Sequence, residues 1–145
     1  NLMIEKIDRV VIAVKDVEKS ISFFSDLLGI TFDEIGGGDE FGFKGSYSGL
    51  GLELLAPTSE DTFMGKFLKN RGEGLWAVVL KVSNLDEAVE KFKSKGLKPA
   101  GEVKEGKMRE VAFHPKDSHG MQIILAEYPE MHPGTVAAKH PDLLP

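Results

Sequence analysis

The sequence predicts an α+β fold made of paired βαβββ modules, because a strand–helix unit occurs in it twice. The first copy runs from Ile7 to Ile30 and the second from Leu75 to Leu97. Each copy begins with alternating apolar residues, the period of a half-buried strand, and continues with apolar residues at helical spacing. Each is followed by enough chain for three further strands. Five apolar positions correspond between the copies: Val10 with Val78, Val14 with Val82, Val17 with Leu85, Ile21 with Val89 and Phe24 with Phe92.

The helix of the first copy has signals at both ends. Asp16 is a typical N-cap residue, and Gly29 is a typical C-cap. Between them, Val17, Ile21, Phe24 and Leu28 recur at the spacing of one helical face, which we expect to be buried. The second copy has Asn84 with Glu87, a capping-box pattern, at the corresponding start.

Three strands are predicted after the first helix. Ile30 to Ile35 is the first candidate, and Gly36 to Gly38 is a predicted turn. Glu40 to Lys44 alternates as a strand does, and Gly49 to Ala56 is a stronger strand that Pro57 ends. The predicted order of elements in the first half is therefore β-α-β-β-β.

The second half repeats this order after a short predicted connecting helix, Asp61 to Lys69. Its predicted elements are strand Leu75–Val82, helix Leu85–Ser94, and strands Pro99–Val103, Arg109–His114 and Met121–Glu127. The predicted boundaries are 5–57 for the first module, 58–74 for the connector, 75–127 for the second module and 128–145 for a C-terminal tail.

Composition excludes several classes of function. The 145 residues include no cysteine, which excludes disulfides, thiolate metal sites and cysteine nucleophiles and suits a cytoplasmic protein. A net charge of −5 disfavours nucleic acid as a partner. No apolar run approaches the roughly 18 residues of a membrane span. We therefore expect a cytoplasmic protein with a small-molecule ligand and with neither nucleic acid nor membrane as partner.

Strand alternation predicts where that ligand binds. One face of each sheet must be covered by its helix, so the other face remains for function. Two curved mixed sheets placed side by side would enclose these faces as a cleft, and such clefts are common ligand sites. The predicted ligand-binding residues on these faces are Arg9, Val11, Glu53, Leu55, Ala77, Val79, Gln122 and Ile124.

Three segments of the sequence resemble those of the vicinal oxygen chelate superfamily, which contains glyoxalase I, bleomycin-resistance proteins and extradiol dioxygenases. They are IDRVVIAVKDVEKSISFFSDLLGI, LELLAP with GKFLKNRGEGL, and VAFHPKDSHGMQIIL. The likeness covers about residues 5 to 127, and within the superfamily it is greatest to the methylmalonyl-CoA epimerases. It implies two βαβββ modules around a cleft, and a homodimer by analogy.

The resemblance also implies a divalent metal held by four ligands, and this chain departs from that pattern. The four family positions fall on Arg9, Glu53, Ala77 and Ile124, of which only Glu53 can ligate a metal. We therefore predict no metal and no other cofactor. Ile124 also replaces the glutamate that serves the epimerases as a base; Glu34 and Glu40 are weak candidates for the partner base.

Arg9 is the most informative of these substitutions. Paired with Glu53, it would place a fixed positive charge near the position of the lost metal. Such a pair either anchors an anionic ligand or only satisfies two buried charges, and both alternatives remain open. Arg9 and Glu53 are the candidate catalytic residues.

Other polar candidates are weaker. Lys81 is a plausible group on the ligand face, and Trp76 is expected in the core. Four histidines have no metal-binding spacing and are expected in loops or in the tail: His114, His119, His132 and His140.

Three functions follow from these observations. The first is a superfamily protein with a degraded metal site that binds an anionic or acyl-CoA-like molecule, with a metal-independent isomerase or lyase as one form. The second is a metal-dependent methylmalonyl-CoA epimerase or lactoylglutathione lyase-like enzyme whose ligands come from elsewhere. The third is a non-catalytic drug-binding or resistance protein with an apolar site.

Overall fold

The computed structural model describes residues 3–129, which form two compact units. The α1 unit comprises residues 10–76 and the α3 unit comprises residues 3–9 and 77–129. Strands β1 (Ile4–Ala13) and β5 (Gly74–Val82) each contribute residues to both units. The module boundaries expected from the repeat stay a prediction.

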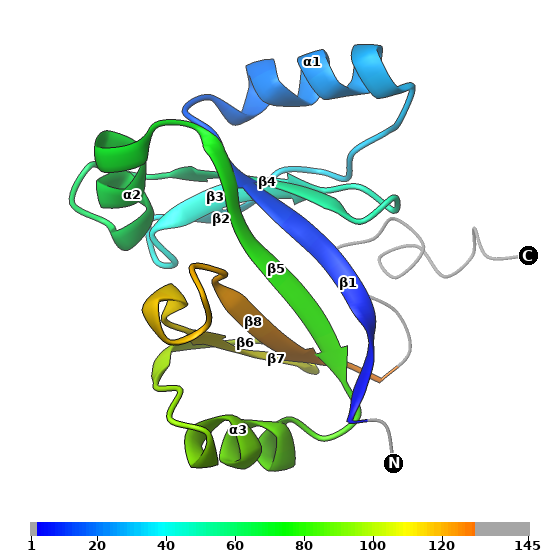
Figure 1. The fold of residues 1–145 in the computed structure, drawn as a ribbon. Helices are drawn as coiled ribbons and strands as arrows, with labels where there is room; N and C mark the ends of the chain where they lie inside the picture. Colours follow the sequence, from blue (N-terminus) through cyan, green and yellow to red (C-terminus); the bar gives the residue numbers. More distant parts are fainter. Residues whose placement is uncertain (1–2, 130–145) are drawn as a thin grey trace, which may run out of the picture. The chain divides into compact units, whose positions relative to one another are not determined.

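The α1 unit contains the first repeat of the βαβββ order (Figure 1). Its strand order is β2-β3-β4-β1, and β1 pairs in parallel with β4 while the other neighbours are antiparallel. Its elements are the end of β1, α1 (Val17–Leu28), β2 (Gly36–Gly38), β3 (Phe43–Tyr47), β4 (Leu52–Pro57) and α2 (Phe63–Arg71).

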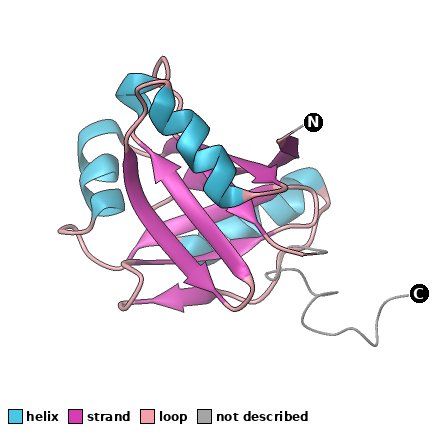
Figure 2. Cartoon of the chain, turned by 90° about the horizontal axis from the view of Figure 1, so that it is seen from below, coloured by secondary structure: helices cyan, strands magenta, loops and turns pink. Residues whose placement is uncertain are grey.

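The α3 unit repeats this topology with the order β5-β8-β7-β6, where β5 pairs in parallel with β8. Its elements are the start of β1, β5, α3 (Leu85–Ser94), β6 (Pro99–Glu105), β7 (Met108–Phe113), the 3₁₀ helix η1 (Pro115–Asp117) and β8 (Ile123–Glu127). The mixture of helix and strand confirms the predicted α+β class (Figure 2).

The register of the parallel pairs shows the internal duplication directly. Val11 lies opposite Glu53 in the α1 unit, and Val79 lies opposite Ile124 in the α3 unit. These are the positions that the sequence repeat makes equivalent. Corresponding residues therefore occupy corresponding places in the two sheets.

Each helix covers one face of its sheet, as the alternation predicts. In the α1 unit the core contains Val14, Val17 and Leu54, with Ile21 and Phe24 packed against it. In the α3 unit the buried residues are Val82, Leu85, Ala88, Val111, Phe113, Ile123 and Leu125. Leu28 was expected in the first core but is 47% exposed, because α1 ends there.

Both predicted helix starts are confirmed. The Asp16 carboxylate accepts a hydrogen bond from the Lys19 amide, and Asn84 accepts one from the Glu87 amide. The backbone N–H of Gly29, which has a left-handed conformation (φ 65°), donates to the Ser25 carbonyl. Local capping chemistry therefore sets the limits of the two repeated helices.

The prediction for the segment after α1 was wrong. Residues 30–35 form a loop, and the strand lies instead at Gly36–Gly38, where a turn was predicted. Gly37 has φ 88°, and a Cβ there would lie 2.4 Å from the Phe43 carbonyl oxygen. Close approach of β3, rather than side-chain pattern, therefore makes this segment a strand. The next strand also begins later than predicted, at Phe43, since Asp39–Gly42 turns the chain.

Candidate functional site

The face of the α3-unit sheet that α3 leaves uncovered carries the predicted site residues of this unit. Leu80, Val111 and Ile123 pack on the α3 side. Because successive side chains of a strand point to opposite faces, their neighbours point to the other side. These neighbours are Val79 and Lys81 on β5, Glu110 and Ala112 on β7, and Gln122 and Ile124 around β8. We call this side the open face because α3 does not cover it; Val79 and Gln122 on this side are nevertheless buried.

A buried charge cluster adjoins this face, and we call it the Arg9 cluster (Asp8, Arg9, Glu110 and Tyr128). Arg9 Nη1 lies 2.7 Å from Asp8 Oδ2, and Arg9 Nη2 lies 2.6 Å from Glu110 Oε2. The Tyr128 hydroxyl donates to Asp8 Oδ1. Arg9 is 4% exposed and Asp8 7%. One guanidinium thus holds two carboxylates, and Asp8, Arg9 and Glu110 together have a formal charge of −1. The exposed Lys6 also contributes a positive charge, with its Nζ 3.9 Å from Asp8 Oδ1.

Lys81 extends the cluster along the same face. Its Nζ lies 3.1 Å from Glu5 Oε2 and 4.5 Å from the centre of the Tyr128 ring. A cation over an aromatic face is attracted by the ring's negative centre. Two contacts therefore hold Tyr128 in place: Lys81 lies over its ring, and its hydroxyl donates to the Asp8 carboxylate.

The family's metal positions fall in both units. Arg9, Ala77 and Ile124 belong to the α3 unit, where Ala77 is buried and Ile124 lies opposite Val79 and Ala112. Glu53 belongs to the α1 unit, on β4. The structure therefore gives Arg9 the carboxylate partners Asp8 and Glu110, and the predicted pair of Arg9 with Glu53 stays a prediction.

Three apolar residues predicted to bind the ligand have buried side chains. Val11 is 1% exposed, Leu55 is 7% exposed and Val79 is fully buried. Val11 is opposite Glu53, so these two predicted residues of the α1 unit lie side by side, whereas Leu55 is opposite Ala13. Gln122 is also buried. The predicted cleft between the modules stays a prediction.

Two of the weaker candidates, His114 and Trp76, have structural roles. His114 caps η1, since its Nδ1 accepts a hydrogen bond from the Lys116 amide. Trp76 is partly buried against Phe63, with ring centres 6.3 Å apart. Glu34 and Glu40 are exposed, as is His119. His132 and His140 lie outside the described residues.

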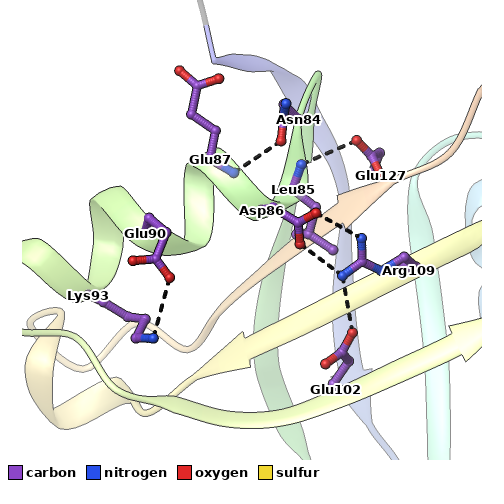
Figure 3. A network of polar contacts seen from close by, with 9 residues as sticks. All are labelled: Asn84, Leu85, Asp86, Glu87, Glu90, Lys93, Glu102, Arg109 and Glu127. Carbon is purple, nitrogen blue, oxygen red and sulfur yellow. Dashed lines mark hydrogen bonds and ion pairs between the residues drawn. The ribbon is translucent and has the colours of Figure 1, made fainter.

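A second polar network lies on the other side of β7 and is structural (Figure 3). Arg109 Nη2 lies 3.0 Å from Asp86 Oδ1 at the start of α3 and 3.4 Å from Glu102 Oε1. The hydrogen bond from Arg109 lowers the pKa of Asp86 below its ordinary value and raises that of Arg109. Asp86 and Glu102 are exposed and Arg109 is partly exposed, so this network ties the start of α3 to β7 at the surface.

Sequence reasoning missed three members of the Arg9 cluster, namely Asp8, Glu110 and Tyr128. One signal was available for Glu110, because Val111 and Phe113 are apolar and alternation then places Glu110 on the opposite side. Asp8 and Tyr128 had no such signal, since their hydrogen bond joins residues far apart in the chain.

Comparison with known proteins places the chain in a family. The model of the Glyoxalase/Bleomycin resistance protein/Dioxygenase superfamily matches residues 6–125. The chain belongs to this superfamily. This match confirms the resemblance to the superfamily that the sequence segments indicated.

The related sequences found within this superfamily are methylmalonyl-CoA epimerases. The chain is 33% identical to the mitochondrial methylmalonyl-CoA epimerase of Mus musculus, over 84% of this chain and 72% of that protein. It is 32% identical to the enzyme of Homo sapiens, over 84% of this chain and 73% of that protein. These matches confirm the predicted likeness to the epimerases.

Solved structures show the same relationship. The methylmalonyl-CoA epimerase of Mycobacterium tuberculosis superposes with a TM-score of 0.79 at 27% identity, covering 88% of this chain and 91% of that one. An epimerase of Streptomyces coelicolor in complex with 2-nitronate-propionyl-CoA also has a TM-score of 0.79, at 26% identity, covering 88% and 99%. A further methylmalonyl-CoA epimerase structure, at 26% identity with a TM-score of 0.79 and coverages of 89% and 98%, was solved with methylmalonyl-CoA and NH4+.

Within residues 3–129, no helix is long and apolar enough to cross a membrane. The cytoplasmic location and the homodimer expected from the sequence stay predictions.

Proposed function

We propose that this protein binds an acyl-CoA-like or other anionic small molecule on the open face of the α3 unit, and that it acts without a divalent metal. The observation that carries the proposal is the burial of Arg9 with two carboxylates, at the position where the resemblance puts the first metal ligand. A guanidinium there is a permanent positive charge, because arginine does not lose its proton in proteins.

The donor atoms of this chain do not fit the family's metal site. A guanidinium has no lone pair to offer, and the side chains of Ala77 and Ile124 have no donor atom at all. Among residues 3–129, no group of three or more His, Asp or Glu side chains is placed to hold an ion. Glu53 alone falls short of the four to six ligands that such ions take.

An acyl-CoA-like ligand is supported by the relatives. Two epimerase structures similar to this chain were solved with CoA thioesters, 2-nitronate-propionyl-CoA and methylmalonyl-CoA. A thioester carbonyl becomes an enolate when the neighbouring carbon loses a proton, and a fixed cation stabilises that negative charge. Arg9 is the buried cation that would serve this purpose, which makes a metal-independent isomerase or lyase the catalytic form of the proposal. Glu53 is a second candidate catalytic residue.

A metal-dependent methylmalonyl-CoA epimerase or lactoylglutathione lyase-like enzyme is the second candidate. The observation in its favour is the identity of 33% to a methylmalonyl-CoA epimerase. It requires ligands that the family pattern does not supply, such as Glu53 with residues beyond position 129. A drug-binding function remains the third hypothesis, although Val11, Leu55 and Val79 are packed in the interior.

Two titrations of the chelator-treated full chain test the proposal. The first measures binding of methylmalonyl-CoA, propionyl-CoA and free CoA by calorimetry, with and without EDTA. The second measures the melting temperature with added Co²⁺, Ni²⁺, Zn²⁺ and Mg²⁺, since a ligand of the native state raises it.

We expect thioester binding that EDTA leaves unchanged and that Arg9→Met abolishes, with no melting shift from the metals. Arg109→Met, which removes an exposed arginine from the other side of β7, is the matched control and should bind normally. If a metal raises the melting temperature and Glu53→Ala abolishes that rise, the metal-dependent function is supported instead. Preference for uncharged aromatic compounds over thioesters would favour a drug-binding protein.

A further inference from the structure

We infer that Glu110 is the proton-transfer residue of this site and takes the place of the carboxylate missing at Ile124. The inference rests on the proposed function, because it assigns a role toward the acyl-CoA-like ligand proposed above. Three observations carry it: the position of Glu110 on the sheet, the charge balance of the Arg9 cluster, and the difference in exposure between its two acids.

The position follows from the register of β7 and β8. Glu110 lies opposite Ala126, and Ala112 lies opposite Ile124, so Glu110 and Ile124 are diagonal neighbours on one face. Diagonal residues of an antiparallel pair are roughly 7–8 Å apart, within reach of a glutamate side chain. A carboxylate at Glu110 therefore serves the same region of the open face as one at Ile124 would.

The charge of Glu110 can change while Asp8 and Arg9 stay paired with each other. Asp8 already neutralises Arg9 through the bond of 2.7 Å, and the Tyr128 hydroxyl fixes that carboxylate in place. Glu110 is the second acid on the same guanidinium. When Glu110 takes up a proton, the three ionisable groups change from a formal charge of −1 to zero while Asp8 and Arg9 remain paired. Proton uptake at Glu110 therefore leaves no buried charge without a partner.

Exposure separates the two acids further. The side chain of Asp8 is 1% exposed, whereas that of Glu110 is 13% exposed. A residue that exchanges protons with a ligand and then with water needs such access. Asp8 is therefore a positioning residue for Arg9, and Glu110 is the acid that can meet a ligand.

The step balances within the site. The carboxylate of Glu110 forms an O–H bond with the proton on the carbon next to the thioester carbonyl, and that C–H bond breaks. Its electron pair moves to the carbonyl oxygen, giving an enolate. The negative charge thus passes from Glu110 to the enolate, and Arg9, which touches Glu110, is placed beside both forms. Return of a proton from Glu110 to the carbon restores the thioester.

Deuterium exchange tests this assignment. Methylmalonyl-CoA is incubated in D₂O with chelator-treated protein, and loss of the signal from the proton at C2 is followed by proton NMR against a protein-free control. We expect wild-type protein to accelerate the exchange and Glu110→Gln to slow it by about 10²–10⁴-fold, the usual contribution of a general base. Glu110→Gln keeps a hydrogen-bond acceptor for Arg9, so calorimetric affinity for methylmalonyl-CoA should persist.

Two further variants complete the design. Glu105→Gln removes an exposed carboxylate from β6 of the same unit and should exchange at the wild-type rate. Glu110→Asp keeps the acid on a shorter side chain and should exchange faster than Glu110→Gln, which a purely structural role would not produce.

The outcomes separate this inference from the proposed function. Undiminished exchange in folded Glu110→Gln overturns the inference, and so does a wild-type protein that binds methylmalonyl-CoA without accelerating exchange. In both cases the proposed binding function stands. Absence of thioester binding by wild-type protein overturns the proposed function and the assignment of Glu110 with it.

Discussion

The hydroxyl of Tyr128 donates a hydrogen bond to the carboxylate of Asp8, which precedes it by 120 residues. Tyr128 follows the last strand, β8, and Asp8 lies in the first strand, β1. Asp8 in turn accepts a hydrogen bond from Arg9. The orientation of the buried Arg9 guanidinium therefore depends on Tyr128, the residue directly after β8.

Removal of this hydroxyl should destabilise the protein. Tyr128→Phe keeps the ring under Lys81 but leaves a buried carboxylate oxygen without its donor, at a cost of about 1.5–3 kcal/mol for a hydrogen bond to a charged group. Urea denaturation measures the change in the free energy of unfolding. Tyr128→Leu also removes the ring that Lys81 contacts and should cost more. A Phe variant as stable as wild type would show that Asp8 does not depend on Tyr128.

Removal of the cluster's cation should cost more than removal of a surface cation. Arg9→Met leaves the carboxylates of Asp8 and Glu110 without Arg9, and breaking a buried pair in this way costs roughly 3–5 kcal/mol. Arg109→Met, which breaks exposed ion pairs, should have a much smaller effect. Both are measured by denaturant unfolding.

A triple variant provides the control for this prediction. Asp8→Asn and Glu110→Gln, combined with Arg9→Met, remove both negative charges together with the positive one. Most of the lost stability should return, because no buried charge is then left without a partner. A triple variant no more stable than Arg9→Met would indicate that arginine packing, rather than charge, explains the loss.

The close approach of β3 and β4 should make Gly45 intolerant of a side chain. A Cβ at Gly45 would lie 2.3 Å from the Leu54 carbonyl oxygen and 2.3 Å from Leu55 Cδ2. Gly45→Ala should therefore cost about 1–3 kcal/mol through overpacking. Gly101→Ala, in strand β6 with no atom within 4 Å of the added Cβ, is the matched control and should be near neutral. Equal melting temperatures for the two variants would contradict this prediction.

Acid should weaken the contact of α3 with β7. Arg109 lowers the pKa of Asp86 below 3.8, so the folded state favours the ionised carboxylate. This contribution is present above the unfolded-state pKa and is lost as the pH falls through the lower folded-state pKa. Asp86→Asn should therefore be less stable than wild type at neutral pH, and the difference should shrink below pH 3.8.

Thermal unfolding between pH 7 and acid pH measures this convergence. Asp39→Asn, which changes an exposed carboxylate in the turn between β2 and β3, provides the control curve. A difference between wild type and Asp86→Asn that stays constant with pH would contradict the role of the ionised carboxylate.

Much of the fold was predictable because the determining interactions are local and repeated. Asp16 and Asn84 cap their helices as expected, and Val17, Ile21 and Phe24 face the core. Val14 and Val82, which the repeat makes equivalent, both lie in the helix-covered cores. These predictions depend on capping chemistry and on the burial of apolar side chains, both of which a single sequence displays.

The segment after α1 was not predictable in the same way. Residues 30–35 alternate enough to suggest a strand, whereas three glycines suggest a turn. Pairing overrides both signals, because Gly36–Gly38 lies against β3 in register with residues 43–45. Strand formation there depends on a partner strand, which local sequence does not specify.

The surroundings of Arg9 were only partly predictable, and the predicted site residues stay a prediction. The sequence marked Arg9 as a departure from the family pattern, and the structure shows it buried. Its partners Asp8 and Glu110 were missed, since a side-chain hydrogen bond between adjacent strand residues and one across 101 positions follow no periodicity.

Residue types and their spacing were enough to predict the duplication, the α+β class, both ends of α1 and the start of α3. Each of these is a matter of residue identity or of spacing along one element. Three features could be learned only from the three-dimensional structure. They are the carboxylate partners of Arg9, the diagonal placement of Glu110 beside Ile124, and the hydrogen bond between Tyr128 and Asp8. These depend on strand register, which brings together residues from distant parts of the chain and so decides where the charged groups meet.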